Sequence, residues 1–103
     1  MATITKTPAI VDSYYVDFVN ELAQGETLSH AQVTAFDKTL GADATAKIVA
    51  ANPAPAISGT QVTFWYQNGD VGKNYVISVE VTTSAGRTLE GDVDLTIVPE
   101  ISP

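Results

Sequence analysis

The sequence predicts an all-β protein, an antiparallel β-sandwich of about seven short strands. Two observations lead to this prediction. First, runs of β-branched and aromatic residues alternate apolar and polar side chains, which is the period of a strand with one buried face. Second, glycine, asparagine and proline residues separate these runs at short intervals, and no run is long enough for a stable isolated helix. Strands that follow one another after short turns pair antiparallel and pack as two sheets.

The 103 residues have the size of a single domain. We expect an N-terminal arm or edge strand over residues 1–11, the sandwich over residues 12–98, and a C-terminal tail over residues 99–103. The arm alternates small and β-branched residues until Pro8, which ends the run because proline cannot donate to a sheet ladder.

Two strands are predicted in the first third of the chain, over residues 13–18 and 27–36. In each of them every second side chain is apolar, so each strand has one face for the core. The residues expected to face inward are Tyr14, Val16, Phe18, Ala31, Val33 and Ala35. Those expected to face outward are Tyr15, Asp17, His30, Gln32 and Thr34.

Residues 44–51 suit two structures. Their alanines and Lys47 favour a helix, because these residue types have high helix propensity. Pro53 and Pro55 follow at once and prevent the helix from continuing. We therefore predict a short strand here.

Three further strands are predicted over residues 61–67, 75–83 and 89–97. The turn before the last strand contains Gly86, which can adopt the positive φ that tight hairpin turns require. The residues expected to face inward are Val62, Phe64, Tyr66, Tyr75, Ile77, Val79, Val81, Leu89, Val93, Leu95 and Ile97. Those expected to face outward are Thr63, Trp65, Ser78, Glu80, Thr82, Asp92, Asp94 and Thr96.

One corner gives the sandwich an immunoglobulin-like (Ig-like) character. Tyr75 stands at the start of the strongest strand with apolar Ile77 two positions later, the arrangement of a tyrosine corner. Ile77 occupies the position where antibody domains have a cysteine, and Trp65 lies on a different strand from their buried tryptophan. We expect an Ig-like architecture that is not a true antibody-type domain.

The charge and the cysteine content exclude several classes of function. Twelve acidic and five basic side chains give a net charge of −7, which opposes binding to nucleic acid or to anionic membranes but permits a basic protein partner. The chain has no cysteine, so disulfides, thiolate zinc sites and cysteine nucleophiles are excluded. It has no apolar run long enough to span a membrane and no hydrophobic signal core, so we expect synthesis in the cytoplasm.

The sequence gives weak grounds for a catalytic or metal site. His30 is the only histidine, and no nucleophile-elbow motif accompanies it, so an exposed strand residue is expected. Glu90, Asp92 and Asp94 share one face of the last strand and have the oxygen ligands that calcium prefers. No calcium-loop motif accompanies them, and we predict a solvated face. We expect no catalytic residue, no cofactor and no metal.

Three residues are candidates for contact with a partner. Trp65 and Tyr15 are aromatic side chains on the outward faces of their strands, and exposed aromatic residues anchor many interfaces. For both residues the alternative is that a loop or the N-terminal arm covers the ring. Arg87, the only arginine, lies at the tip of the predicted hairpin and could bind a carboxylate of a partner. A solvated tip is its default interpretation, and on either view we expect Arg87→Ala to leave the fold intact.

Three segments of the chain carry a set of distinctive motifs: DSYYVDFVNELAQGETLSHAQVTA, GTQVTFWYQNGDVGKNYVISVEVTTSAGRT and DVDLTIVPE. The motifs are an aromatic-Asp-aromatic strand, a Leu-Ala-x-Gly-Glu-Thr turn, a Val-Thr-x-Trp strand and a Thr-Thr-Ser-Ala-Gly-Arg-Thr hairpin. Together they resemble a family of small virion proteins of tailed bacteriophages. The resemblance extends from about Asp12 to Val98. It is interrupted at residues 44–55, a segment that is longer and richer in alanine than the short strand usual at this place in the family. The matching residues are Tyr15, Asp17, Phe18, Gly25, Glu26, Trp65, Tyr75, Gly86 and Arg87.

This resemblance implies a structural virion protein without an active site, made in the cytoplasm of the host bacterium. Its partners would be other virion proteins of the tail, fibre or capsid, and it would be present in several copies in a symmetric assembly. The leading hypothesis is a fibre-tail adaptor. One alternative is a capsid decoration protein on the head surface. A different class is an Ig-like carbohydrate-binding or adhesion module, with Trp65 and Tyr15 as its aromatic platform.

Overall fold

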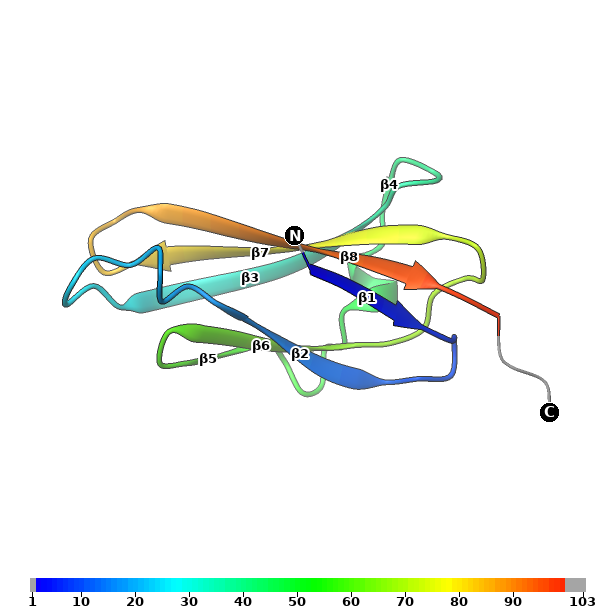
Figure 1. Cartoon of the computed structure of the whole chain (residues 1–103), viewed down its shortest axis with the longest axis horizontal. Helices are drawn as coiled ribbons and strands as arrows, with labels where there is room; N and C mark the ends of the chain where they lie inside the picture. Colours follow the sequence, from blue (N-terminus) through cyan, green and yellow to red (C-terminus); the bar gives the residue numbers. More distant parts are fainter. Residues whose placement is uncertain (1, 100–103) are drawn as a thin grey trace.

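The structure is a computed structural model that describes residues 2–99, and within them the chain forms two packed β-sheets (Figure 1). The predicted all-β sandwich is confirmed. Met1 and residues 100–103, which are most of the expected C-terminal tail, lie outside the described residues. The strands are β1 (Ala2–Lys6), β2 (Asp12–Asp17), β3 (Leu28–Asp37), β4 (Ala42–Asp43), β5 (Ala56–Ser58), β6 (Gln61–Tyr66), β7 (Asn74–Thr83) and β8 (Thr88–Ile97), and the helix is α1 (Thr45–Ile48).

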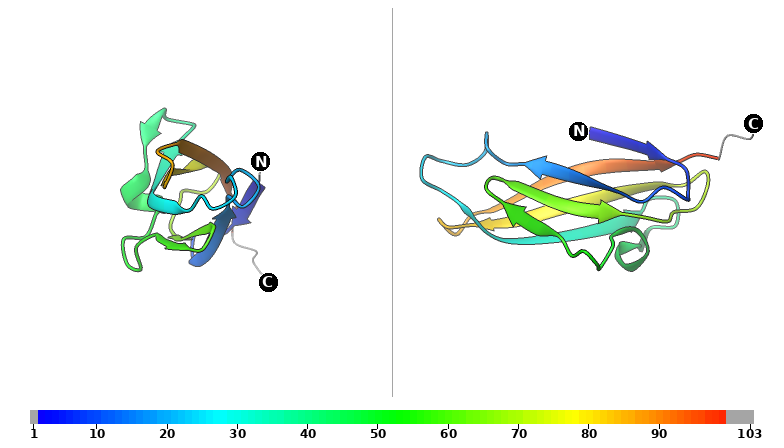
Figure 2. Two further views of the ribbon diagram at one scale, coloured as in Figure 1. Left: turned by 90° about the vertical axis from the view of Figure 1, so that its left-hand side faces the viewer. Right: turned by 90° about the horizontal axis from the view of Figure 1, so that it is seen from below.

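The order of strands in the two sheets is that of an Ig-like sandwich. One sheet has the order β1-β8-β7-β3-β4 and the other β2-β6-β5. In immunoglobulin terms β8, β7 and β3 occupy the places of strands G, F and C, while β2, β6 and β5 occupy those of B, E and D. The two layers are visible in Figure 2. Every strand pair is antiparallel except β1 with β8, which is parallel.

The core lies between the sheets and is built from the alternating apolar residues of the strands. On β7 the four apolar inward side chains are fully buried, Thr83 at its end is buried as well, and the outward neighbours are half-buried or exposed. The strands β6 and β8 show the same alternation. The fully buried residues of these three strands include Val62, Phe64, Tyr75, Ile77, Val79, Val81 and Leu95. The inward faces predicted for these strands are therefore confirmed, with Leu89 only half-buried.

The tyrosine corner is present at the start of β7. The Tyr75 hydroxyl accepts a hydrogen bond of 3.1 Å from the backbone N–H of Asp70, while the ring is fully buried. The turn beneath it is tight: Gly69 has φ +101°, and a Cβ atom on it would lie 2.5 Å from Cδ1 of Ile97. Only glycine fits this position, because both the backbone conformation and the space exclude a side chain.

The prediction of a short strand at residues 44–51 is wrong. Residues 45–48 form the single turn of α1, flanked by the two-residue strand β4. The Asp43 carboxylate accepts hydrogen bonds from the backbone N–H (3.3 Å) and the hydroxyl (2.6 Å) of Thr45, which holds the start of the turn. Ile48 at its end is fully buried. One turn suffices to bring Ile48 into the core, and the proline-rich segment that follows leads to β5, a strand that the alternation pattern did not reveal.

The expected N-terminal arm is the edge strand β1, and it pairs with β8 of its own chain. Ile4 and Lys6 of β1 are buried. The Lys6 ammonium group donates hydrogen bonds to the carbonyls of Pro8 (3.3 Å) and Asn68, and burial lowers the pKa of Lys6. These contacts fasten the end of β1 to the turn beside the tyrosine corner.

The two ends of the sandwich differ in their loops. The hairpin end, at the left of Figure 1, consists of residues 18–27 and the β7–β8 turn at residues 84–87. The corner end, at the right, consists of the loops at residues 7–11, 38–41 and 68–73. The β3–β4 hairpin stands away from the body of the sandwich at the corner end (Figures 1 and 2).

Candidate functional site

At the hairpin end, Arg87 and Glu26 form an ion pair between two segments far apart in sequence. The Nε atom of Arg87 donates to Oε2 of Glu26 at 3.0 Å, and a terminal guanidinium nitrogen donates to Oε1 at 2.5 Å. The same nitrogen donates to the carbonyl of Glu21 at 2.8 Å. The Glu26 side chain is only 4% exposed, whereas that of Arg87 is 47% exposed. This two-pronged geometry is the strongest form of an arginine–carboxylate contact.

The carboxylate of Glu26 is held by further donors. The Thr83 hydroxyl donates to Oε2 at 2.5 Å, and the backbone N–H of Ala23 donates to Oε1 at 2.8 Å. Hydrogen bonds from Arg87, Thr83 and Ala23 lower the pKa of Glu26 to about 2. The same contact with Glu26 raises the pKa of Arg87. Both groups therefore remain charged at neutral pH, and the ion pair is a structural clamp.

A second pair of contacts joins the same two segments. The backbone N–H of Ser84 donates to the carbonyl of Thr27 at 2.8 Å, and the N–H of Thr27 donates to the Ser84 hydroxyl at 3.0 Å.

The interpretation of Arg87 as a solvated tip is wrong, because its guanidinium binds Glu26. The sequence does not reveal Glu26 as the partner of Arg87; its only signal is that both residues belong to the most distinctive motifs. A contact of Arg87 with another protein stays a prediction.

The outer face of the three-stranded sheet carries the two candidate aromatic residues. Tyr15 on β2 lies opposite Thr63 on β6, and Ser13 lies opposite Trp65. Tyr15 and Trp65 are thus diagonal neighbours on one face, a spacing that aromatic side chains can bridge. Tyr15 is 56% exposed and Trp65 is half-buried. The N-terminal arm belongs to the other sheet, so it does not pair with the strand that carries Trp65. Their role in partner binding stays a prediction.

The corner end exposes apolar side chains. Four large apolar residues in the loops of this end are exposed to solvent. They are Ile10, Val11, Leu40 and Val71. Exposed apolar side chains are therefore concentrated at the corner end. Figure 1 shows the three loops that carry them at the right of the molecule. Gathered exposed apolar groups are typical of protein–protein contacts.

The same end holds all four lysines of the chain. Lys38 pairs with Asp94 at 3.2 Å and Lys47 with Asp70 at 2.6 Å. Lys73 lies 3.3 Å from Asp37, and buried Lys6 binds backbone carbonyls. The charges of Lys38, Lys47 and Lys73 are therefore offset locally by the carboxylates that they contact.

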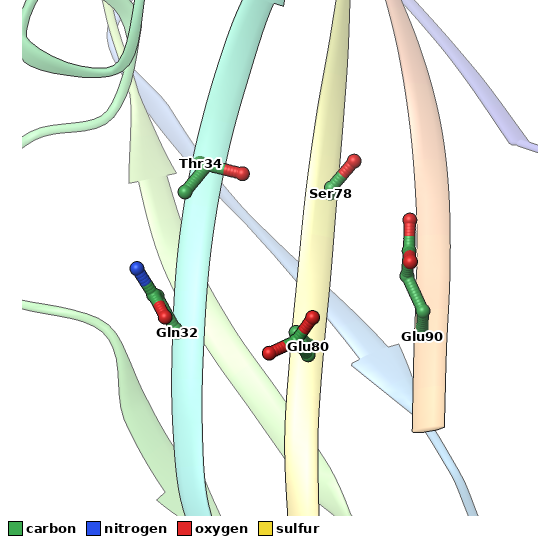
Figure 3. A pocket seen from close by; sticks show the side chains of 5 residues that line it. All are labelled: Gln32, Thr34, Ser78, Glu80 and Glu90. Atoms are coloured by element: carbon green, nitrogen blue, oxygen red, sulfur yellow. The ribbon is translucent and has the colours of Figure 1, made fainter. Parts of the chain in front are cut away.

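That outer face forms a shallow, polar hollow of about 290 Å³. Figure 3 shows its lining residues on β3, β7 and β8. Glu80 and Glu90 are direct cross-strand neighbours, and this juxtaposition of like charges is destabilising. The lining residues are Gln32, Thr34, Ser78, Glu80 and Glu90.

Asp92 continues the acidic row beside Glu90. Asp92 raises the pKa of Glu90 in two ways: its carboxylate accepts a hydrogen bond that only protonated Glu90 can donate, and its negative charge disfavours ionised Glu90.

His30 is exposed on β3. Within residues 2–99 the acidic and histidine side chains form no group of three or more that could hold a metal ion. The one helix of that range, α1, has four residues, far too few to cross a membrane.

Comparison with known proteins identifies one family. Residues 6–96 match the sequence model of the family described as podophage GP4 fiber-tail adaptor protein gp77. The match includes both segments of the Glu26–Arg87 clamp and most of both sheets. A search of curated proteins finds no match to the chain.

Proposed function

The chain belongs to the podophage GP4 fibre-tail adaptor protein family, and on that premise we propose that it is a structural virion protein that joins a fibre to the phage tail. The observation that carries this proposal is the family match over most of the chain. The expected location is the virion, and the expected partners are fibre and tail proteins.

The geometry supports a docking role. An adaptor has to contact two different proteins, and this sandwich offers chemically different surfaces. The corner end has exposed apolar loops, whereas the outer face of the large sheet is acidic. Apolar groups bind through burial of surface, and acidic groups select a basic partner surface.

We also propose that the protein has no enzymatic activity. The most strongly bound charged groups serve the fold: Arg87 and Glu26 hold two segments together, and Lys73 joins the loop before β7 to Asp37 at the end of β3. The hollow lined by Glu80 and Glu90 is shallow and open, unlike the closed, mostly apolar pockets of small-molecule sites.

The test is the number and position of copies in purified virions. Quantitative mass spectrometry against the major capsid protein gives the number, and immunogold labelling gives the position. An adaptor is expected at the tail alone, on the order of a dozen copies in a closed ring. Copies on the order of hundreds over the head would overturn the proposal in favour of capsid decoration. Absence from virions would overturn it in favour of a carbohydrate-binding or adhesion module.

A further inference from the structure

The three-stranded sheet has an open edge at β2. In Ig-like domains of this strand order, strand A lies beside strand B and completes the sheet. Here the first strand, β1, pairs with β8 in the other sheet, and β2 pairs only with β6 among the described residues. The place beside β2 is therefore unfilled by any strand of residues 2–99.

The backbone groups on this edge can be identified from the ladder. The N–H of Phe18 donates to the carbonyl of Thr60 at 2.9 Å, directly after the β2–β6 pairing. Hydrogen-bonded pairs alternate along an antiparallel ladder, so the even-numbered residues of β2 bond to β6. The backbone N–H and carbonyl groups of Ser13, Tyr15 and Asp17 then point away from the sheet. The Ser13 N–H is bonded to the Asp12 side chain at 2.7 Å, which leaves the N–H groups of Tyr15 and Asp17 as outward donors.

This edge has little of the usual protection against strand addition. Protein edges are blunted by shortness, charged side chains (lysine above all), proline or a bulge. Of the four edge strands, β4 and β5 have two and three residues, and β1 ends in the buried Lys6. The strand β2 has six residues, contains no lysine or proline, carries charge only at its first and last residues, Asp12 and Asp17, and pairs with β6 without a register shift.

The side chains of β2 also leave room for a neighbour. Tyr14 and Val16 point toward the core but are only half-buried, so the core is incompletely covered at this edge. Tyr15 on the outer face is 56% exposed. A strand beside β2 would cover the two inward residues with its own apolar side chains and would contact the Tyr15 ring.

We propose that the open edge of β2 is a strand-docking site, and that it takes an extended, basic segment of another virion protein as a fourth strand of the sheet. The backbone supplies the hydrogen bonds, as in other cases of β-strand addition. The proposal rests on the proposed function, because it names the chemistry of one partner of the adaptor.

Charge selects the kind of segment. Asp12 and Asp17 are exposed at the two ends of β2. The Asp17 carboxylate also accepts hydrogen bonds from the Thr60 hydroxyl at 2.7 Å and the Gln61 amide at 3.4 Å, so it offers a partner its charge more than a free oxygen. A segment with alternating apolar residues and a lysine or arginine near each end would match both the core face and these carboxylates. A second copy of this chain fits less well, since each copy has a net charge of −7 and would bring the same two aspartates to the edge.

Hydrogen–deuterium exchange in purified virions tests the site. In the free chain the amide hydrogens of Tyr15 and Asp17 should exchange fast. In the virion they should exchange as slowly as the amides in the middle of β6. Virions that carry the chain at the tail and still exchange these two amides fast would overturn this inference and leave the adaptor function standing. Virions that lack the chain at the tail would overturn the adaptor function itself.

Two variants separate the backbone contribution from the side chain. Tyr15→Pro removes the outward N–H but no hydrogen bond to β6, and proline is accepted on edge strands in this orientation. Tyr15→Thr removes the same ring and keeps the N–H. The threonine variant should enter virions, and the folded proline variant should be lost from them. Equal incorporation of both variants would contradict a backbone-docked strand.

A photo-crosslinking residue at position 15 identifies the occupant, and it keeps the proposal testable if the proline variant does not fold. Crosslinking to a basic segment of a fibre or tail protein would support the proposal. Crosslinking to a second copy of this chain alone would overturn it in favour of self-association through β2.

Discussion

The guanidinium of Arg87 binds both carboxylate oxygens of Glu26, a residue 61 positions earlier in the chain. The carboxylate is buried and the guanidinium is half exposed. This contact fastens the loop before β3 to the β7–β8 hairpin, and the two segments are the most distinctive motifs of the sequence. Glu26 of one motif and Arg87 of the other therefore contact each other at the hairpin end.

The sequence alone led us to expect that Arg87→Ala leaves the fold intact, and the contact with Glu26 reverses that expectation. The substitution should destabilise the fold, because it leaves the buried Glu26 carboxylate without its counter-charge. The urea midpoint should fall by several times the loss caused by Lys38→Ala, which removes the exposed Lys38–Asp94 pair. Arg87→Lys should restore only part of the stability, because an ammonium group cannot bind both oxygens in the same way. Equal midpoints for Arg87→Ala and Lys38→Ala would show that the clamp is dispensable.

Lowering the pH should reduce the free energy of unfolding, because Glu26 becomes protonated. Its pKa is lowered in the folded state from an ordinary 4.5 to about 2, so its contribution is complete above pH 4.5 and is lost as the pH falls toward 2. Hydrogen bonds from Thr60 and Lys47 lower the pKa of Asp17 and Asp70, which adds to the loss with the same sign. Urea unfolding across this range should show a shallower pH dependence for Glu26→Gln. An unchanged slope in that variant would assign the acid sensitivity to other carboxyl groups.

Tyr75→Phe should cost about 1 kcal/mol, the typical net value of one hydrogen bond, because the ring stays in the core and only the contact with the Asp70 N–H is lost. Tyr15→Phe is the matched control, since the Tyr15 side chain is exposed and its loss of a hydroxyl should leave stability unchanged. Chemical denaturation of both variants measures the difference. Equal stability of the two variants would mean that the corner contact contributes nothing.

Gly69→Ala should be markedly more destabilising than Gly72→Ala. Both glycines have positive φ, at +101° and +83°, so both substitutions should cost about 1 kcal/mol in backbone strain. At Gly72 an added Cβ meets open space, whereas at Gly69 it meets the buried Ile97 side chain at 2.5 Å. Displacing a packed core residue should add about 2 kcal/mol. Thermal unfolding of the pair measures the cost of the clash alone, and equal melting temperatures would mean that Ile97 moves aside freely.

Much of the fold follows from short-range patterns. The alternation of residues 75–83 predicted the inward set of β7, and all four residues of that set are fully buried. Such alternation is a local property, because successive side chains of a strand point to opposite faces whatever the strand pairs with. The tyrosine corner was predictable for the same reason, since Tyr75 and Asp70 are five residues apart. The segment 44–51 was not, because its helix propensity and its prolines favour different structures and the burial of Ile48 decides between them.

Residue types and their local order suffice to predict an acidic, cysteine-free sandwich, the faces of its main strands and its resemblance to a phage virion family. The contact between Arg87 and Glu26, the parallel pairing of β1 with β8 and the open edge of β2 become apparent only in the folded chain. The difference lies in the range of the interactions. The side-chain period of a strand is fixed by neighbouring residues, whereas a contact across 61 positions and the choice of sheet for β1 depend on how the whole chain closes its core.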